Sequence, residues 1–403
     1  MTSRSEDGDE ITNELRNKLT NEVRKERRLS DPADRGRILT VVIAPDSFKG
    51  TVPAADAATA VAEGWHAVRE QDEVLTIPLA DGGEGTVAAV AAARPDGVLH
   101  RVDGLRGPDG RQVSASWLEL DPGTPDSTAV IEMASVSGLP LMDRLDPLGA
   151  TTYGLGQLIN AALDSGCRTV IVGAGGSATT DGGAGALAAL GLHLLDDHGR
   201  PVPYGGAELG RLAKITGRVR RPEKLIMLSD VDAPLLGPRG AAAVFGPQKG
   251  ADPEQIVILD AALSRFAALL GGPTDEPGMG AAGGLGYGLV AGLGAVITPG
   301  APYLAGLAGL PVALARADLV ISGEGRFDET SLGGKVVGYV LTQAAAHQVD
   351  SMIIAGQVAH RVDGIAALSL AELSGSTQAA LADPIHWLRL AGSRAAASLP
   401  VTH

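Results

Sequence analysis

Acidic, hydroxyl and basic side chains follow several apolar runs of this chain, most of them next to glycine. The first run, "VVIAP", leads into Asp46, Ser47 and Lys49. One such ending is a common turn, because Gly and Asp are favoured in turns. Five endings could converge on one site, since ligands bind beyond the carboxyl ends of parallel strands. The other four follow "TIPLA" (Asp81, Glu84), "VIVGAGG" (Ser177, Thr179, Asp181), "IMLS" (Asp230, Asp232) and "LVISGEG" (Arg326, Asp328).

Glycine loops combined with carboxylates indicate a particular chemistry. Glycine lets backbone N–H groups approach an anion, and the start of a following helix adds a positive dipole. Carboxylates in the same place would repel a phosphate unless a divalent cation lies between them. Mg²⁺ held by one or two carboxylates and by phosphate oxygens resolves this conflict. The residue types therefore predict phosphoryl transfer from a nucleotide.

Strand and helix patterns alternate along the chain, which predicts an α/β fold. The short apolar runs are typical of strands buried on both faces, and each lies near a helical pattern. Residues 100–132 differ, because turn signals and period-two alternation there predict a hairpin. We expect two α/β domains with mainly parallel sheets and helices on both faces. The predicted strands are 38–45, 73–80, 168–174, 224–230, 318–324 and 351–358.

The length of 403 residues exceeds that of one ordinary hydrophobic core, so two domains are expected. The hairpin is predicted to mark the entry to the second domain, and a Gly-rich region near residue 280 its exit. This division gives a charged tail at 1–37, a discontinuous domain of 38–104 plus 286–403, and an inserted domain at 105–285.

The tail is too charged to be a signal peptide, and its acidic residues argue against an organelle transit peptide. It carries one thin apolar stripe that could dock a partner. Its composition favours a frayed helix or a disordered tail instead. The stripe consists of Ile11, Leu15, Leu19 and Val23.

Charge and cysteine content exclude several classes of function. The net charge of −14 argues against a nucleic-acid partner, because phosphate neutralisation needs clustered Lys and Arg. Cys167 is the only cysteine, so no internal disulfide can form and a cytoplasmic location is expected. Residues 277–315 carry no charge, but proline and glycine interrupt them. We interpret them as buried helices of a soluble domain with no membrane role.

One motif favours a different chemistry. The sequence "GAGGSA" at 173–178 fits the dinucleotide-binding pattern after a predicted strand, and Asp196 and Asp197 follow at about the expected 20 residues. Against this reading, "TTDGGAG" places another acid and more glycine where the helix of that motif should already run. An NAD(P)-dependent dehydrogenase therefore remains an alternative.

Six longer motifs resemble, in order, those of the type 1 glycerate kinases. They are "IAPDSFKGT", "PLADGGEGT", "GGSATTDGGAGALAALG", "FGPQKGA", "GMGAAGGLGYGL" and "ISGEGRFDETSLGGK". The resemblance covers roughly residues 38–395. It implies ATP-dependent phosphorylation of D-glycerate with Mg²⁺, generally at the 2-hydroxyl to give 2-phosphoglycerate. It also implies two α/β domains with the active site in the cleft between them.

With this resemblance, the strand-end residues receive expected roles. Lys49 would neutralise the transferring phosphoryl group or hold the glycerate carboxylate, and Asp46 would orient it. Asp181 would be the base for the glycerate hydroxyl or a metal ligand. The remaining expected roles are substrate binding by Ser47, Asp81, Glu84 and Arg326, nucleotide binding by Gly175, Gly176, Ser177, Thr179 and Lys335, and metal binding by Asp230, Asp232 and Asp328.

The chain departs from the family pattern in two places. Pro53 stands where a helix-capping Ser is usual, so Thr51 is the expected cap. Ser229 and Ala233 replace a Cys and an Asn, so any amide contact at position 233 is lost. Neither change removes a group that the chemistry needs. A non-catalytic sugar-acid sensor that kept the fold is the other alternative, although Lys49, Asp181 and Asp328 are retained.

Overall fold

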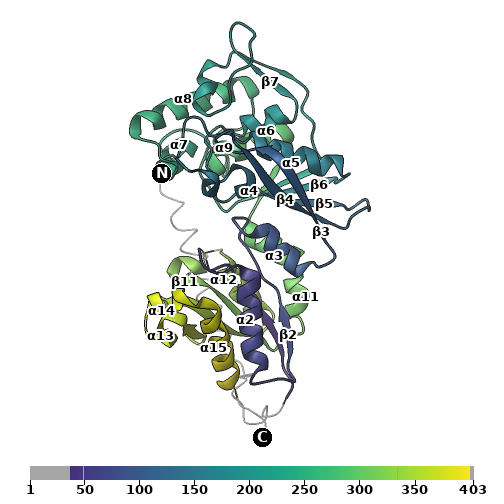
Figure 1. The fold of residues 1–403 in the computed structure, drawn as a ribbon, viewed down its shortest axis with the longest axis vertical. Coiled ribbons are helices and arrows are strands. Elements are labelled where there is room, and N and C mark those ends of the chain that lie inside the picture. Colours follow the sequence, from purple (N-terminus) through teal and green to yellow (C-terminus); the bar gives the residue numbers. More distant parts are fainter. Residues whose placement is uncertain (1–36, 49, 334, 400–403) are drawn as a thin grey trace. The chain divides into compact units, whose positions relative to one another are not determined.

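The computed structural model describes residues 37–48, 50–333 and 335–399. These residues form two compact units, each built on its own main sheet (Figure 1). Unit 1 holds the described residues up to Asp81, Ala88–Ala93, and those from Ala301 on, whereas unit 2 holds Gly82–Val87 and Arg94–Gly300. Most strand pairs are parallel, so the predicted α/β fold with mainly parallel sheets is confirmed.

Unit 1 has a five-stranded parallel sheet in the order β13-β12-β11-β1-β2. In this sheet Val42 of β1 lies between Leu75 of β2 and Val320 of β11. Both faces are covered by helices, which is why the central strands are apolar at successive positions. The strands are β1 (Thr40–Ile43), β2 (Glu73–Thr76), β11 (Leu319–Phe327), β12 (Asp350–Val358) and β13 (Ala366–Ser369).

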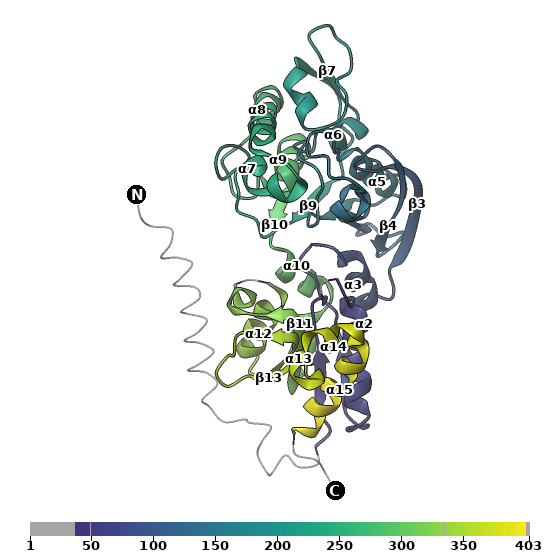
Figure 2. The ribbon, with the colours of Figure 1, turned by 60° about the vertical axis from the view of Figure 1, so that its left-hand side comes forward.

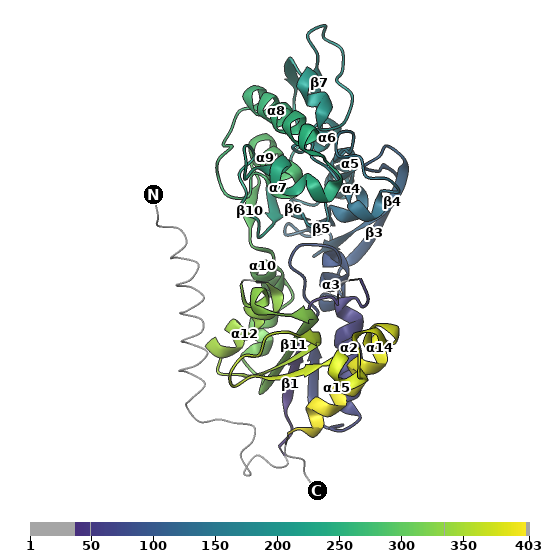
Figure 3. The same cartoon turned by 90° about the vertical axis from the view of Figure 1, so that its left-hand side faces the viewer.

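Helices of unit 1 pack on both faces of this sheet (Figure 3). Successive strand residues point to opposite faces. Val41 therefore packs with α2 and α15, whereas Val42 packs with α10, α11 and α12. These helices are α2 (Ala54–His66), α10 (Gly300–Leu307), α11 (Leu310–Leu314), α12 (Val336–Ala346) and α15 (Pro384–Ala397), and the shorter α13 (Leu370–Ser374) and α14 (Thr377–Ala382) follow β13.

Helix α2 begins without the cap that the sequence predicts. Pro53 is the N-cap residue and makes no side-chain cap. The Thr51 hydroxyl instead donates to the Phe48 carbonyl at 2.7 Å. The prediction that Thr51 caps this helix is therefore wrong, because its hydroxyl closes the preceding turn.

Two glycines let α2 and α15 lie in backbone contact (Figure 1). A Cβ atom on Gly64 would lie 1.9 Å from the Arg389 carbonyl oxygen, and one on Gly392 would lie 2.2 Å from that of Val61. Gly64→Ala is therefore expected to destabilise the protein by about 3 kcal/mol, despite the better helix propensity of alanine.

Urea unfolding of Gly64→Ala beside Gly306→Ala tests this contact. Gly306 is also helical, but a Cβ atom there would meet nothing within 4 Å. Gly306→Ala is therefore expected to gain up to about 1 kcal/mol. Equal stabilities of the two variants would contradict the close approach of the helices.

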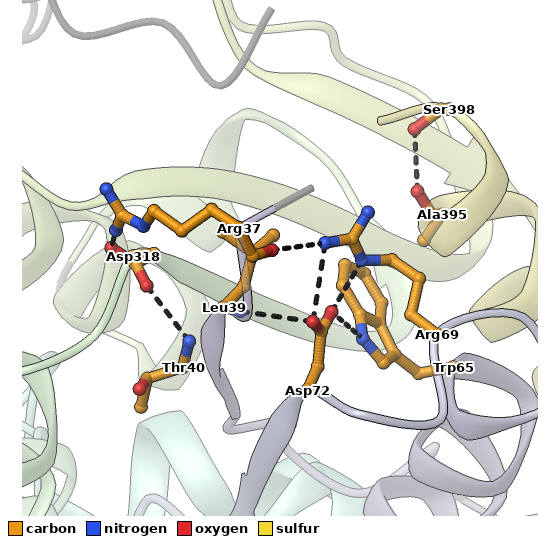
Figure 4. A network of polar contacts seen from close by, with 9 residues as sticks. All are labelled: Arg37, Leu39, Thr40, Trp65, Arg69, Asp72, Asp318, Ala395 and Ser398. Carbon is orange, nitrogen blue, oxygen red and sulfur yellow. Dashed lines mark hydrogen bonds and ion pairs between the residues drawn. The ribbon is translucent and has the colours of Figure 1, made fainter. Parts of the chain in front are cut away.

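A buried ion pair fastens the start of β1 to the turn that follows α2 (Figure 4). The Asp72 carboxylate accepts hydrogen bonds from the Leu39 amide at 3.0 Å and from Trp65 Nε1 at 3.0 Å. Arg69 Nε donates to the same carboxylate at 2.5 Å, and both side chains are buried. Removing either partner would leave an uncompensated buried charge, so this corner is held in one arrangement.

Unit 2 has a six-stranded mixed sheet in the order β10-β9-β6-β5-β4-β3. The first four strands in this order run parallel, and β4 pairs antiparallel with both β5 and β3. The hairpin predicted at 100–132 is thus present as the β3–β4 pair. The strands are β3 (Val98–Arg106), β4 (Gln112–Leu120), β5 (Thr128–Glu132), β6 (Thr169–Gly173), β9 (Lys224–Leu228) and β10 (Val296–Thr298).

The core of unit 2 joins one face of this sheet to α5, α6, α8 and α9 (Figure 2). The strands contribute alternate residues such as Ala129 and Ile131 to it. Helix α8 begins with a capping box, in which Asp252 accepts from the Gln255 amide at 2.8 Å. The helices are α3 (Thr86–Ala93), which starts in unit 2, α4 (Ala134–Ser137), α5 (Tyr153–Asp164), α6 (Ala184–Ala189), α7 (Ala241–Phe245), α8 (Pro253–Leu270) and α9 (Ala281–Leu293).

The strand after α6 does not belong to a parallel sheet. β7 (Leu192–Leu195) pairs antiparallel with β8 (Lys214–Gly217) in a separate two-stranded sheet. Asp196 follows β7 and accepts from the Arg200 amide within the loop of this pair. A dinucleotide-binding unit needs its second strand parallel to the first, with the acid at its end. The dehydrogenase alternative that uses 173–178, Asp196 and Asp197 is therefore wrong.

The predicted domain boundaries at 104/105 and 285/286 fall inside unit 2. The first would cut β3, which pairs with β4 from Val98 to Arg106, and the second would cut α9. The observed divisions lie instead between 81 and 94 and at 300. Of the predicted tail 1–37, only Arg37 is among the described residues.

The uncharged stretch 277–315 forms α9, β10, α10 and α11. Across the described ranges, no helix combines the length and the apolar composition needed to cross a membrane.

Candidate functional site

Glycine residues bring the loop 82–87 close to the ends of two strands of unit 2, β6 and β9. The Gly175 amide, after β6, donates to the Gly82 carbonyl at 3.2 Å. A Cβ atom on Gly175 would lie only 2.5 Å from Gly83 Cα. On its other side, a Cβ atom on Gly82 would lie 2.8 Å from Leu228 Cβ at the end of β9. Only glycine permits this packing, so the loop 82–87 and the loop after β6 form one surface of backbone groups.

Glu132 lies at the end of β5 beside this surface, and sequence reasoning missed it. Its Oε2 accepts from the Val87 amide at 3.4 Å, and the side chain is buried. Burial raises the pKa of Glu132, the amides of 85–87 oppose that shift, and the nearby Glu84 carboxylate adds to it. The sequence does offer a signal for Glu132, because it is an acidic residue at the end of an apolar strand, like the other predicted site residues.

Glu132→Gln is expected to gain stability over the wild type as the pH rises from 5 to 8. Because the pKa of Glu132 is raised in the folded protein, the folded state binds the proton more tightly than the unfolded state does. Wild-type stability therefore falls as the pH rises from the ordinary value through the raised one, whereas Gln carries no such titration. Urea unfolding at several pH values measures the difference, and a difference independent of pH would contradict this environment.

Asp181 organises the loop after β6 and is itself 1% exposed. Oδ2 accepts from the Thr152 amide at 2.8 Å, the Thr152 hydroxyl at 2.9 Å and the Gly185 amide at 3.2 Å. Oδ1 accepts from the Gly183 amide at 3.1 Å and from the same Thr152 hydroxyl. Burial raises the pKa of Asp181, and the Thr152 and glycine hydrogen bonds oppose that shift. Through these hydrogen bonds the Asp181 carboxylate joins the loop after β6 to the starts of α5 and α6.

Ser177 and Thr179 belong to a buried polar cluster with Lys249. Lys249 Nζ donates to the Thr179 carbonyl at 2.5 Å and to Ser177 Oγ at 3.4 Å. The Ser177 hydroxyl also lies 3.2 Å from the Ala282 carbonyl. The motif "FGPQKGA" that contains Lys249 predicts no role for this residue, because its partners are about 70 residues away.

Gly176 shapes the same loop, with a left-handed φ of 75°. Its carbonyl accepts from the Leu139 amide at 2.9 Å, and the neighbouring Gly138 pairs with Ser177 as an isolated bridge. Two hydroxyls beside this bridge, those of Ser137 and Thr180, are buried and have no hydrogen-bond partner among the described residues.

Asp230 and Asp232 follow β9 as exposed residues. Asp230 Oδ1 accepts from the Gly300 amide at 3.2 Å. In the part of the chain that the structure describes, no three or more His, Cys, Asp or Glu side chains are grouped to hold a metal ion.

In unit 1, the segment after β1 runs beside β11. The Asp46 amide donates to the Gly323 carbonyl at 2.8 Å, and its carboxylate accepts from the Ser47 amide at 2.6 Å. The side chain of Asp46 is buried. Lys49, the residue that Asp46 was expected to orient, lies outside the described residues. Asp81 is half-buried at the end of this unit's first segment.

The residues after β11 form a second polar group in unit 1. Arg326 Nε lies 3.4 Å from Asp328 Oδ2, and Arg326 Nη1 donates to Gln357 Oε1 at 3.0 Å. Asp328 caps the turn that follows and accepts from the Thr330 hydroxyl at 2.6 Å, which lowers the pKa of Asp328 together with the Arg326 charge. Lys335 Nζ donates to Thr330 Oγ1 at 3.4 Å.

The predicted site residues thus form groups within each unit. Asp46 and Ser47 form one group and Arg326, Asp328 and Lys335 another, both in unit 1. In unit 2 the loop around Gly175, Ser177 and Thr179 packs on the loop that holds Glu84, and Asp230 and Asp232 follow the neighbouring strand β9.

Comparison with known proteins agrees with these motifs. Residues 41–399 match the glycerate kinase family. The chain is 42% identical over 332 residues to glycerate kinase of Bacillus subtilis (79% of this chain, 85% of the relative) and 41% identical over 331 residues to glycerate 2-kinase of Escherichia coli K12 (79% and 86%).

A solved structure supports the same relationship. The fold is similar to the crystal structure of a candidate glycerate kinase 2 from Salmonella typhimurium LT2, with a TM-score of 0.78 and 38% identity. The match covers 90% of this chain and 98% of that one. With most of its length matched by the family and by relatives above 40% identity, the chain belongs to the glycerate kinase family.

Proposed function

We propose that this protein transfers the γ-phosphoryl group of ATP to D-glycerate, at the 2-hydroxyl, to give 2-phosphoglycerate. The observation that carries this proposal is the backbone contact between the glycine loops of unit 2, in a chain that belongs to this family. Glycine loops of this kind let a phosphate approach the backbone without side chains in the way.

The nucleotide phosphates are proposed to bind the loop after β6, through Gly175, Gly176, Ser177 and Thr179. Gly176 takes a left-handed conformation that turns successive amides, and concave amide loops of this kind bind anions. Lys335 of unit 1 stays a predicted nucleotide-binding residue, and it lies in a hydroxyl-rich turn at the start of α12.

The residues present fit Mg²⁺ bound together with phosphate. Asp230 and Asp232 are exposed and two residues apart, and one or two carboxylates are what Mg²⁺ usually takes when phosphate oxygens complete its shell. We propose these two as ligands, and Asp328 of unit 1 stays a predicted metal ligand. When bound, the cation would neutralise charge on the phosphates.

On the substrate side, Lys49 and Arg326 are proposed to hold the glycerate carboxylate or the transferring group, with Asp46, Ser47, Asp81 and Glu84 around the hydroxyls. Arg326 offers a planar pair of donors suited to a carboxylate or phosphate. We assign Asp181 to loop organisation rather than to proton abstraction, because protein donors surround both of its oxygens. Phosphoryl transfer through a loose transition state depends more on positioning and charge than on a strong base.

Release of ADP that depends on D-glycerate tests this function. Purified protein with ATP, Mg²⁺ and D-glycerate is expected to release ADP, and omission of glycerate is expected to stop the release. A protein that binds glycerate but never releases ADP would be a sensor, and that outcome would refute the proposal. The reaction and the single cysteine fit a cytoplasmic enzyme with a small-molecule substrate and no nucleic-acid or membrane partner.

A further inference from the structure

We propose that Lys249 is a positioning residue, which holds the loop from Gly175 to Asp181 in the conformation that binds the phosphates of ATP. This inference rests on the proposed function, because it takes that loop as the phosphate-binding one. It adds a residue to which neither the family motifs nor the relatives' names give a role.

Lys249 joins three segments that are far apart in the sequence. The turn Pro247–Lys249 places its side chain in the interior, where the residue is 1% exposed. There its ammonium donates to the Thr179 carbonyl and to Ser177 Oγ. The Ser177 hydroxyl in turn contacts the Ala282 carbonyl at 3.2 Å. The lysine thus connects its own turn to the glycine loop and to the start of α9.

The start of α9 is shaped to receive this contact. Ala282, Gly283 and Gly284 all have left-handed backbone conformations, with φ of 53°, 73° and 86°. A Cβ atom on Gly283 would lie 1.9 Å from the Thr179 carbonyl oxygen and 2.7 Å from Lys249 Nζ. The Gly182 amide also donates to the Gly283 carbonyl at 3.1 Å. The backbone next to the Lys249 ammonium is therefore strained at Ala282, and position 283 requires glycine because any side chain there would collide.

Burying the charged Lys249 amine among these segments costs free energy. Burial lowers the pKa of Lys249 to about 7, and Asp181, whose carboxylate is held by Thr152 and the glycines, only partly offsets that shift. No carboxylate forms an ion pair with Lys249 among the described residues, and the other titratable group on the packed segments, Tyr287, bonds to backbone carbonyls. An apolar side chain would fill the same space at less cost. What it could not do is hold the Thr179 carbonyl.

Lys249 adds to the hydrogen bonds that this loop already makes through Asp181 and through its backbone amides. The Thr180 hydroxyl is buried without a partner in the described part of the chain, and so is the Ser137 hydroxyl on the paired segment. The Thr179 carbonyl accepts from Lys249 Nζ at 2.5 Å and, at the longer distance of 3.3 Å, from Ser177 Oγ. Removing the ammonium is therefore expected to free the segment on which Ser177 and Thr179 lie.

Lys249→Met tests the proposal, with Lys224→Met as the matched control on an exposed lysine of the same unit. Amide hydrogen exchange at 175–183 is expected to be about tenfold faster in Lys249→Met, the effect of losing one charge-assisted hydrogen bond, and unchanged in Lys224→Met. In turnover assays, KM for ATP is expected to rise by about tenfold and KM for D-glycerate by less than about twofold.

Unchanged exchange at 175–183 in folded Lys249→Met would overturn the proposal, and so would an equal rise of KM for both substrates. If Lys249→Met does not fold, Ser177→Ala decides by hydrogen exchange at 175–183 alone, since it removes the hydroxyl that Lys249 and Ala282 share. KM for ATP is not used for this variant, because Ser177 is itself proposed to bind the phosphates. A wild type without glycerate-dependent ADP release would refute the proposed function alone, because hydrogen exchange still tests the positioning role.

Discussion

Asp181→Ala is expected to destabilise unit 2 by about 4 kcal/mol and to lose turnover because its loop is disordered. The carboxylate accepts from the Thr152 amide and hydroxyl and from the Gly183 and Gly185 amides, all inside the protein. Alanine would leave these donors buried without acceptors, and unpaired buried donors are among the most costly defects in a fold.

Urea unfolding and turnover of the same preparation measure both effects. Asp197→Ala is the control, because Asp197 lies exposed in the loop after β7 and its contact with His198 spans 3.7 Å. Its stability is expected to stay within about 0.5 kcal/mol of the wild type. Asp181→Ala with wild-type stability and no turnover would restore the catalytic role that the sequence motif suggests.

Gly283→Ala is expected to cost about 3 kcal/mol and to reduce turnover. The residue has φ +73°, and a Cβ atom there would collide with the Thr179 carbonyl oxygen at 1.9 Å. The collision would push that carbonyl away from Lys249 and with it the loop proposed to bind phosphate. Two costs therefore add at this position, backbone strain and a backbone contact that cannot yield.

Gly294→Ala separates these two costs. Gly294 ends the same helix α9 with φ +74°, but a Cβ atom there would meet nothing within 4 Å. It is expected to cost only the left-handed strain, about 1 kcal/mol, with turnover unchanged. Chemical denaturation of both variants decides, and equal losses of stability would show that the crowding at Gly283 has no effect.

The sequence predicted strands well where both faces are buried. β1, β6 and the first three residues of β11 are buried apolar runs, as expected for strands of a parallel sheet covered on both faces. β10 and β13 were missed, because each is short and only partly buried. The first predicted domain boundary, at 104/105, lies after the observed division between 81 and 94, and the second, at 285/286, lies before the observed division at 300. The sequence signals used for these boundaries do not coincide with the ends of hydrogen-bonded strands.

The site was harder to predict than the fold. The strand ends that carry the site residues could be predicted, because glycine and acidic residues follow these strands. The contacts of each side chain could not, because they come from segments that are distant in the sequence. Asp181 was expected to do chemistry, yet its partners come from Thr152, 29 residues earlier. Lys249 contacts Thr179 across 70 residues, a relation that no local pattern carries. Motifs locate a functional region. Burial and hydrogen bonding are needed to propose which of its residues contact the substrate and which position the loop.

Phosphorus NMR of the reaction product tests the central claim most directly. Purified protein is incubated with ATP, Mg²⁺ and D-glycerate, and the phosphomonoester that appears is identified by its coupling to the glycerate protons. The proposed function predicts 2-phosphoglycerate, formed in equal amount with ADP. Formation of 3-phosphoglycerate would contradict the position of transfer, and the absence of any phosphoglycerate would contradict the kinase activity itself.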